Sequence, residues 1–162
     1  MGNKNNDDFG FVEKAVEKIK HYCAYQERSH FEVREKLYSL GLYKTQVETI
    51  LTQLIADGYL DEERFACSFA RGKFNLKQWG RIKIKYALKL KLVSDYNIKT
   101  ALKQIDENDY KAILQKIAAA KWDALKGGHY ISRQAKTTSY LLQKGFEPPL
   151  VQQVVRELAK GE

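Results

Sequence analysis

Apolar residues recur with one spacing in three stretches that lie about fifty residues apart along the chain. In the first stretch they are Leu37, Leu42, Val47, Ile50, Leu51 and Leu54. Moving 51 residues onward gives Leu88, Val93, Ile98, Ala101, Leu102 and Ile105. A further 53 residues gives Leu141, Phe146, Val151, Val154, Val155 and Leu158. The last four positions of each set follow the i, i+3, i+4, i+7 spacing of a helix that buries one face. The pattern predicts three copies of one helical unit.

Each copy is predicted to hold three helices. Ser29 with Glu32, and Thr45 with Glu48, match the capping-box pattern that opens a helix, and Ser132 has the same role in the third copy. Prolines number only two, and residues with high helix propensity are plentiful. We therefore predict an all-α protein of three tandem three-helix, helix-turn-helix-like repeats that form an elongated, curved array. The predicted units span residues 1–60, 61–108 and 109–162.

Positive charge is concentrated in the second predicted unit. Its run of basic residues comprises Arg71, Lys73, Lys77, Arg81, Lys83, Lys85, Lys89 and Lys91. No acidic residue interrupts this run, and the next one is Asp95. The second unit has eleven basic and six acidic residues, the third nine and five, and the first eight and nine. Such segregation produces a one-sided positive face that attracts an acidic partner, either nucleic acid or protein.

The middle helix of the second unit, predicted over 80–92, has two apolar stripes. Ile84 and Leu88 lie on the stripe that faces the core of the unit, whereas Ile82, Tyr86 and Leu90 lie nearly opposite. A helix with two apolar stripes is usually buried on both sides. We therefore favour packing of the second stripe against the next unit over an exposed stripe that binds a partner.

The residues indicate no catalytic, metal or cofactor site. The three histidines lack partners at metal-ligand spacing, no glycine-rich phosphate loop occurs, and Asp61 and its acidic neighbours suit a helix start. Cys23 and Cys67 are expected to be buried free thiols. No apolar run reaches the ~18 residues of a membrane span, and the first residues lack the apolar core of a secretion signal. We expect a cytoplasmic protein that is not an enzyme, needs no cofactor and does not bind a membrane.

Two kinds of function remain open from the residues alone. The chain could bind single- or double-stranded DNA, with basic helices on phosphates and with Trp79 and Tyr86 stacking on bases. Alternatively, it could be a regulator whose elongated array lies along another protein. The basic residues extend along the whole helix instead of concentrating at its start, which weakens the case for base reading.

Several motifs resemble those of the RecX family, bacterial regulators of the RecA recombinase. The most specific is the run from Asp57 to Ala66, which reads Asp-Gly-Tyr-Leu-Asp-Glu-Glu-Arg-Phe-Ala. Arg28-Ser29 with Glu32 and Leu37 is similar to the start of the family's second helix, and Gly80-Arg81-Ile82 to the start of its basic helix. The resemblance covers nearly the whole chain from Ala24 onward. One departure is Leu92, which stands where the family usually has a glycine.

The resemblance implies a protein of tandem three-helix units that binds the RecA nucleoprotein filament. Family members limit filament extension and inhibit ATP hydrolysis, strand exchange and co-protease activity, in DNA repair, recombination and the SOS response. We expect a monomer whose filament or DNA contacts are the basic residues from Arg71 to Lys91 named above. The family motif is expected to be mainly structural, with Asp61 as a helix cap and Arg64 holding the first unit against the second. Its members are Gly58, Tyr59, Leu60, Asp61, Arg64, Phe65 and Ala66.

Overall fold

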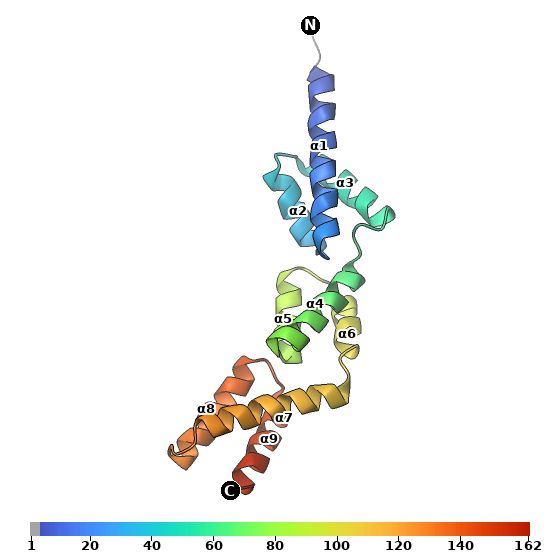
Figure 1. The fold of residues 1–162 in the computed structure, drawn as a ribbon. Coiled ribbons are helices and arrows are strands. Elements are labelled where there is room, and N and C mark those ends of the chain that lie inside the picture. The colour runs from blue at the N-terminus through green and yellow to red at the C-terminus, as the bar shows by residue number, and fades with distance from the viewer. Residues whose placement is uncertain (1–3) are drawn as a thin grey trace.

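The computed structural model describes residues 4–162, which form nine helices and no strand. The helices are α1 (Lys4–Tyr25), α2 (His30–Ser39), α3 (Lys44–Ala56), α4 (Glu62–Lys77), α5 (Arg81–Leu90), α6 (Asp95–Lys103), α7 (Glu107–Ala124), α8 (Tyr130–Gln143) and α9 (Pro148–Lys160). Figure 1 shows α1–α3, α4–α6 and α7–α9 as groups arranged one after another, with α1 and α9 at opposite ends of the molecule. The predicted all-α array of three three-helix units is confirmed. We call α1–α3, α4–α6 and α7–α9 the first, second and third units.

The repeated apolar residues form the cores of the units, as their spacing predicts. Leu37, Leu88 and Leu141, which are equivalent in the three copies, are all completely buried. Leu51 is also buried, whereas its equivalent Leu102 is only partly buried because it lines a surface groove. Leu158, at the end of the third set, is also partly buried. The repeat in the sequence is therefore a repeat in the structure, with two positions that are only partly buried.

The turn after the middle helix repeats as well. Gly41 and Gly145 adopt left-handed backbone conformations, with φ of +93° and +94°. At the equivalent position of the second unit, Leu92 adopts φ of 59° although it is not a glycine. A left-handed conformation crowds the Cβ atom of any residue except glycine. Leu92 is therefore a strained position in the second unit.

The second and third units share one apolar core, whereas the first unit has its own. At the joint between the second and third units, the Tyr110 ring lies between the rings of Phe74 and Phe146, with centroid distances of 5.8 and 5.2 Å. The boundaries at 60/61 and 108/109 stay a prediction. The second of them falls inside the first turn of α7, which begins at Glu107.

Several predicted helix starts differ from the structure. Ser29 caps α2 in a complete capping box with Glu32, as predicted. The predictions for Thr45 and Ser132 are wrong, because α3 begins at Lys44 and α8 at Tyr130. At the start of α3 the Gln46 side chain accepts from the Tyr43 backbone N–H at 3.1 Å, whereas no side chain caps the start of α8. The burial of the apolar faces of these two helices stabilises them without a cap from Thr45 or Ser132.

The second apolar stripe of α5 is exposed, which contradicts our prediction that it packs against the next unit. Ile82, Tyr86 and Leu90 retain 49%, 64% and 61% of their accessible surface. The third unit instead contacts the backbone at the start of α5. It therefore does not cover the apolar stripe along the helix. Within the described residues, no helix has both the length and the apolarity of a bilayer span.

Candidate functional site

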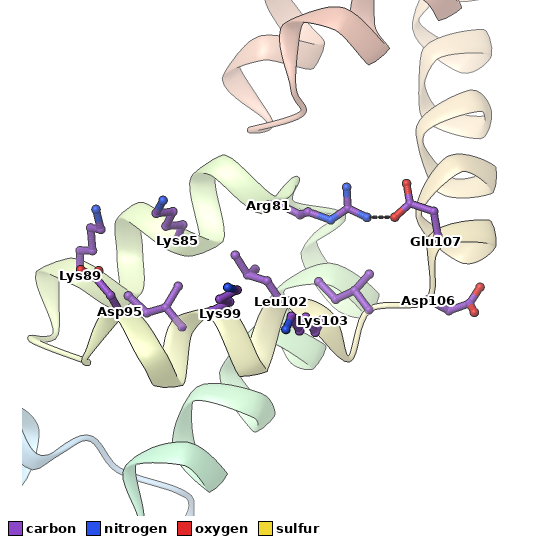
Figure 2. A pocket seen from close by; sticks show the side chains of 11 residues that line it. Arg81, Lys85, Lys89, Asp95, Lys99, Leu102, Lys103, Asp106 and Glu107 are labelled. Carbon is purple, nitrogen blue, oxygen red and sulfur yellow. Dashed lines mark hydrogen bonds and ion pairs between the residues drawn. The ribbon is translucent and has the colours of Figure 1, made fainter.

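A groove of about 750 Å³ runs between α5, α6 and the start of α7. Figure 2 shows Arg81, Lys85 and Lys89 along α5, and Lys99 and Lys103 along α6. Both rows arise from the helical repeat, because residues four apart lie on the same side of a helix. The apolar lining consists of Ile98, Leu102 and Ile105. We call this feature the lysine groove.

Four of the five cations in the lysine groove are available to a ligand. Lys85, Lys89, Lys99 and Lys103 are exposed. Among the residues that the structure describes, none of the four has a carboxylate at ion-pair distance. The lining also contains three carboxylates, Asp95, Asp106 and Glu107, so its five cations leave a net positive charge that attracts an anionic partner.

Arg81, the fifth cation, belongs to the joint between the second and third units. Its guanidinium forms ion pairs with Glu147, at 2.9 Å, and with Glu107. The same guanidinium lies 3.8 Å from the centre of the Tyr110 ring, and the Arg81 backbone N–H donates to the Tyr110 hydroxyl at 3.1 Å. These contacts pair the Arg81 side chain with residues of the third unit. Arg81 therefore holds the third unit in place and does not offer an unpaired charge to a ligand.

Lys91 also joins two units. Its Nζ lies 2.5 Å from Oε1 of Glu32, which completes the capping box of Ser29 at the start of α2 in the first unit. Both side chains are partly buried. The predicted contact residues Arg81 and Lys91 therefore have defined structural partners at the two ends of α5.

Another groove, on the side of α4 and α5 that faces the first unit, is lined by aromatic residues. Phe31, Phe69 and Trp79 line it, together with Lys73 and Lys77. We call it the aromatic groove. The ammonium groups of Lys73 and Lys83 lie 4.9 and 4.6 Å from the centre of the Trp79 ring. Because both interact with the π-face of this ring, a nucleobase could stack on Trp79 only by displacing one of them.

Arg71 lies away from both grooves. It is exposed on α4, near Asp61, Glu63 and Arg64. The basic run predicted as one face is therefore divided among the lysine groove, the aromatic groove, the two joints and this acidic neighbourhood.

Asp61 and Arg64 of the Gly58–Ala66 motif lie at the joint between the first and second units. Asp61 caps α4 by accepting from the Arg64 backbone N–H at 2.8 Å. The Arg64 guanidinium donates to Glu27 at 2.7 Å and to the Gly58 carbonyl at 3.1 Å. The motif thus ties the end of the first unit to the start of α4.

The apolar residues of the motif pack in the cores on either side of that joint. Leu60 is buried in the core of the first unit, and Phe65 and Ala66 are buried in the shared core of the second and third. Tyr59 is partly exposed, and the Lys20 ammonium lies 5.3 Å from its ring centre.

Sequence reasoning missed Lys99 and Lys103 as members of the site. They are outside the basic run because Asp95 precedes them, yet α6 places them in the same groove as the lysines of α5. Their spacing of four residues was the available signal. This spacing places both lysines on one face of a helix, but it does not identify the helix that lies beside that face.

Comparison with known proteins assigns the chain to a family. Residues 61–102 match the model of the second three-helix domain of RecX. The regulatory protein RecX of Prosthecochloris aestuarii is 30% identical over 145 residues, which are 90% of this chain and 93% of the relative. That of Clostridium perfringens is 31% identical over 134 residues, which are 81% of this chain and 62% of the relative.

Solved structures agree with the sequence matches. The crystal structure of RecX from Lactobacillus salivarius superimposes with a TM-score of 0.82 and 25% identity, covering 92% of this chain and 97% of that one. A second crystal structure of a regulatory protein RecX gives a TM-score of 0.80 at 25% identity, covering 94% and 72%. With this fold, this motif at the joint and these relatives, the chain belongs to the RecX family of regulatory proteins.

Proposed function

We propose that this protein binds RecA nucleoprotein filaments and inhibits their extension, ATP hydrolysis, strand exchange and co-protease activity. The observation that carries the proposal is the lysine groove, which is lined by four exposed and unpaired lysines of the second unit. This is also the unit that the family model matches. A nucleoprotein filament offers both acidic protein surface and phosphates, and either would complement the groove.

The elongated array supports binding to a polymer. Because the units are arranged in a row, the array can contact several subunits of a filament at the same time. The contacts of Arg64 and Lys91 hold the first unit, and those of Arg81 hold the third. Contacts from linked units raise the effective affinity, provided that the spacing of the units fits the partner. A protein that bridges or covers RecA subunits in this way would inhibit extension of the filament.

The second candidate is direct binding to DNA, and the aromatic groove is the observation that favours it. Partly exposed aromatic rings beside lysines are the arrangement that binds single-stranded nucleic acid. However, Lys73 and Lys83 already lie over Trp79, and the lysine groove is lined by aliphatic residues that cannot stack on bases. We therefore place DNA binding second.

The proposal is tested by adding the purified protein to RecA assembled on single-stranded DNA. ATP hydrolysis and filament length, the latter by electron microscopy, are followed as the protein concentration increases up to that of RecA. We expect both to fall. If an equimolar amount leaves both unchanged, the proposed function is wrong.

A further inference from the structure

Helix α5 has a stripe of apolar side chains that is exposed on the surface of the second unit. Ile82, Tyr86 and Leu90 lie at i, i+4 and i+8 and therefore share one face of the helix. Each is about half or more exposed, whereas Ile84 and Leu88 on the other side of α5 are completely buried. We call the three exposed residues the apolar crest. Clustered exposed apolar side chains on a soluble protein mark interaction sites.

The apolar crest lies between the two grooves and has lysines on both sides. Lys85 and Lys89, on one flank, line the lysine groove. On the other flank, Leu90 itself lines the aromatic groove together with Lys73 and Lys77. Helix α5 contains no acidic residue. A partner that covers the crest must therefore bring apolar surface at its centre and negative charge around it.

Two other occupants fit these features less well. A second copy of this chain that packed crest against crest would bring Lys85 and Lys89 of both copies together, and like charges repel. A nucleic acid would complement the charge of the lysines. However, the aliphatic side chains of Ile82 and Leu90 form no favourable contact with phosphates and cannot stack on bases as aromatic rings do.

We propose that α5 docks as a helix into an apolar cleft on a protein partner, with carboxylates at the rim of that cleft. Ile82, Tyr86 and Leu90 are the anchors that enter the cleft, and the flanking lysines pair with its rim. Recognition of a helix by a groove commonly uses side chains at such spacing. This inference rests on the proposed function, and it assigns the central contact to the protein of the filament and not to its DNA.

The test replaces the crest while preserving the helix and its charge. In the variant Ile82→Gln, Tyr86→Gln, Leu90→Gln, three anchors become polar residues of high helix propensity. The control is Tyr25→Gln, Tyr43→Gln, Ile55→Gln, because these three side chains are exposed in the first unit. Circular dichroism establishes that both variants are folded. Binding to RecA–single-stranded-DNA filaments is then measured by cosedimentation over a series of salt concentrations.

The crest variant should bind at least about tenfold more weakly at every salt concentration, because buried anchors dominate protein interfaces. The slope of affinity against salt should stay that of the unaltered protein, since no charge has changed. The control should bind like the unaltered protein. Normal binding by the crest variant, or equal loss in both variants, would overturn the inference while leaving the proposed function intact. Failure of the unaltered protein to bind would instead overturn the proposed function and the inference with it.

Self-association is measured in the same preparations by analytical ultracentrifugation. The inference predicts the same mass for the unaltered protein and the crest variant. A dimer that dissociates in the crest variant alone would show that a second copy covers the crest, and the inference would be wrong.

Discussion

Gly80 and Gly145 bring the backbones of the second and third units into direct contact. A Cβ atom on Gly80 would lie 2.3 Å from the carbonyl carbon of Gly145, far inside van der Waals distance. The Gly80 N–H donates to the Lys144 carbonyl at 2.7 Å, and the Ile82 N–H donates to the Gly145 carbonyl at 3.0 Å. Glycine is therefore required at the start of α5 by this close approach, which explains the Gly-Arg-Ile motif physically.

Replacing Gly80 by alanine should force the two units apart. We expect Gly80→Ala to lower the free energy of unfolding by about 1–3 kcal/mol, the usual range for overpacking a close contact. Gly72→Ala is the matched control, because nothing lies within 4 Å of a Cβ at that helical position. It should raise the free energy of unfolding by about 0.5–1 kcal/mol, as alanine stabilises helix interiors relative to glycine. Urea unfolding followed by circular dichroism measures both, and the same sign for both would contradict this account of the joint.

The strain at Leu92 predicts a stabilising substitution. A left-handed conformation costs about 1–2 kcal/mol for a residue with a Cβ atom, and glycine avoids this cost but loses more entropy on folding. We expect Leu92→Gly to raise the free energy of unfolding by about 0.5–1 kcal/mol. Leu92→Ala keeps the Cβ atom and should give little change. A destabilised glycine variant would show that the exposed Leu92 side chain contributes more than its conformation costs.

Equivalent positions of the repeat should differ in their sensitivity to truncation. Leu51→Ala removes a buried side chain and should cost about 2–5 kcal/mol of unfolding free energy. Leu102→Ala should cost less than about 2 kcal/mol, because this side chain is only partly buried beside the lysine groove. Thermal or urea unfolding distinguishes the two, and equal losses would mean that the groove is closed in solution.

Tyr110 predicts a dependence of stability on alkaline pH. Burial, and then the hydrogen bond that its hydroxyl donates to Glu147, raise the pKa of Tyr110 well above the ordinary value of 10.0. Above pH 10 the unfolded state loses this proton while the folded state retains it, so stability decreases as pH rises.

Tyr110→Phe tests this coupling. At neutral pH the substitution should cost about 1–2 kcal/mol, because it removes the hydrogen bonds to Glu147 and from the Arg81 N–H. That difference should shrink as pH increases beyond 10, since the variant has no such proton to retain. Urea unfolding of both proteins between pH 8 and 11 measures the difference. A constant difference across this range would contradict the raised pKa.

The sequence predicts the helices well because their signal is local. Apolar spacing identifies the buried faces, and Ser29 with Glu32 marks a helix start within four residues. By contrast, whether a charged side chain forms an ion pair within the protein depends on residues far away in the sequence. The Arg81 guanidinium meets Glu147, 66 positions away, and Lys91 meets Glu32, 59 positions away. No local pattern distinguishes these structural cations from the free lysines of the groove.

The prediction for the apolar crest is wrong for the same reason, because a local pattern does not identify distant contacts. Two apolar stripes on α5 indicate two apolar environments, but not whether the second belongs to this chain or to a partner. The answer depends on how the third unit is attached, and the contact between Gly80 and Gly145 places it at the start of α5.

The lysine groove can be tested without disturbing the joints. The variant Lys85→Ala, Lys89→Ala, Lys99→Ala, Lys103→Ala removes four exposed charges and leaves Arg81 in place. If the groove meets acidic protein surface, this variant should lose inhibition of the filament while its affinity for bare DNA barely changes. If it meets phosphates, the log–log salt dependence of binding to single-stranded DNA should flatten by about three units. A control of equal charge is Lys111→Ala, Lys116→Ala, Lys126→Ala, Lys160→Ala in the third unit, and it should retain inhibition.

The most direct measurement of the central claim compares three binding partners under one buffer condition. The purified protein is titrated into RecA–single-stranded-DNA filaments, into the same DNA without RecA, and into RecA without DNA. We predict that it binds the filament more tightly than either component alone. Equal affinity for filament and bare DNA, or no binding to the filament, would contradict the claim that the filament is the target.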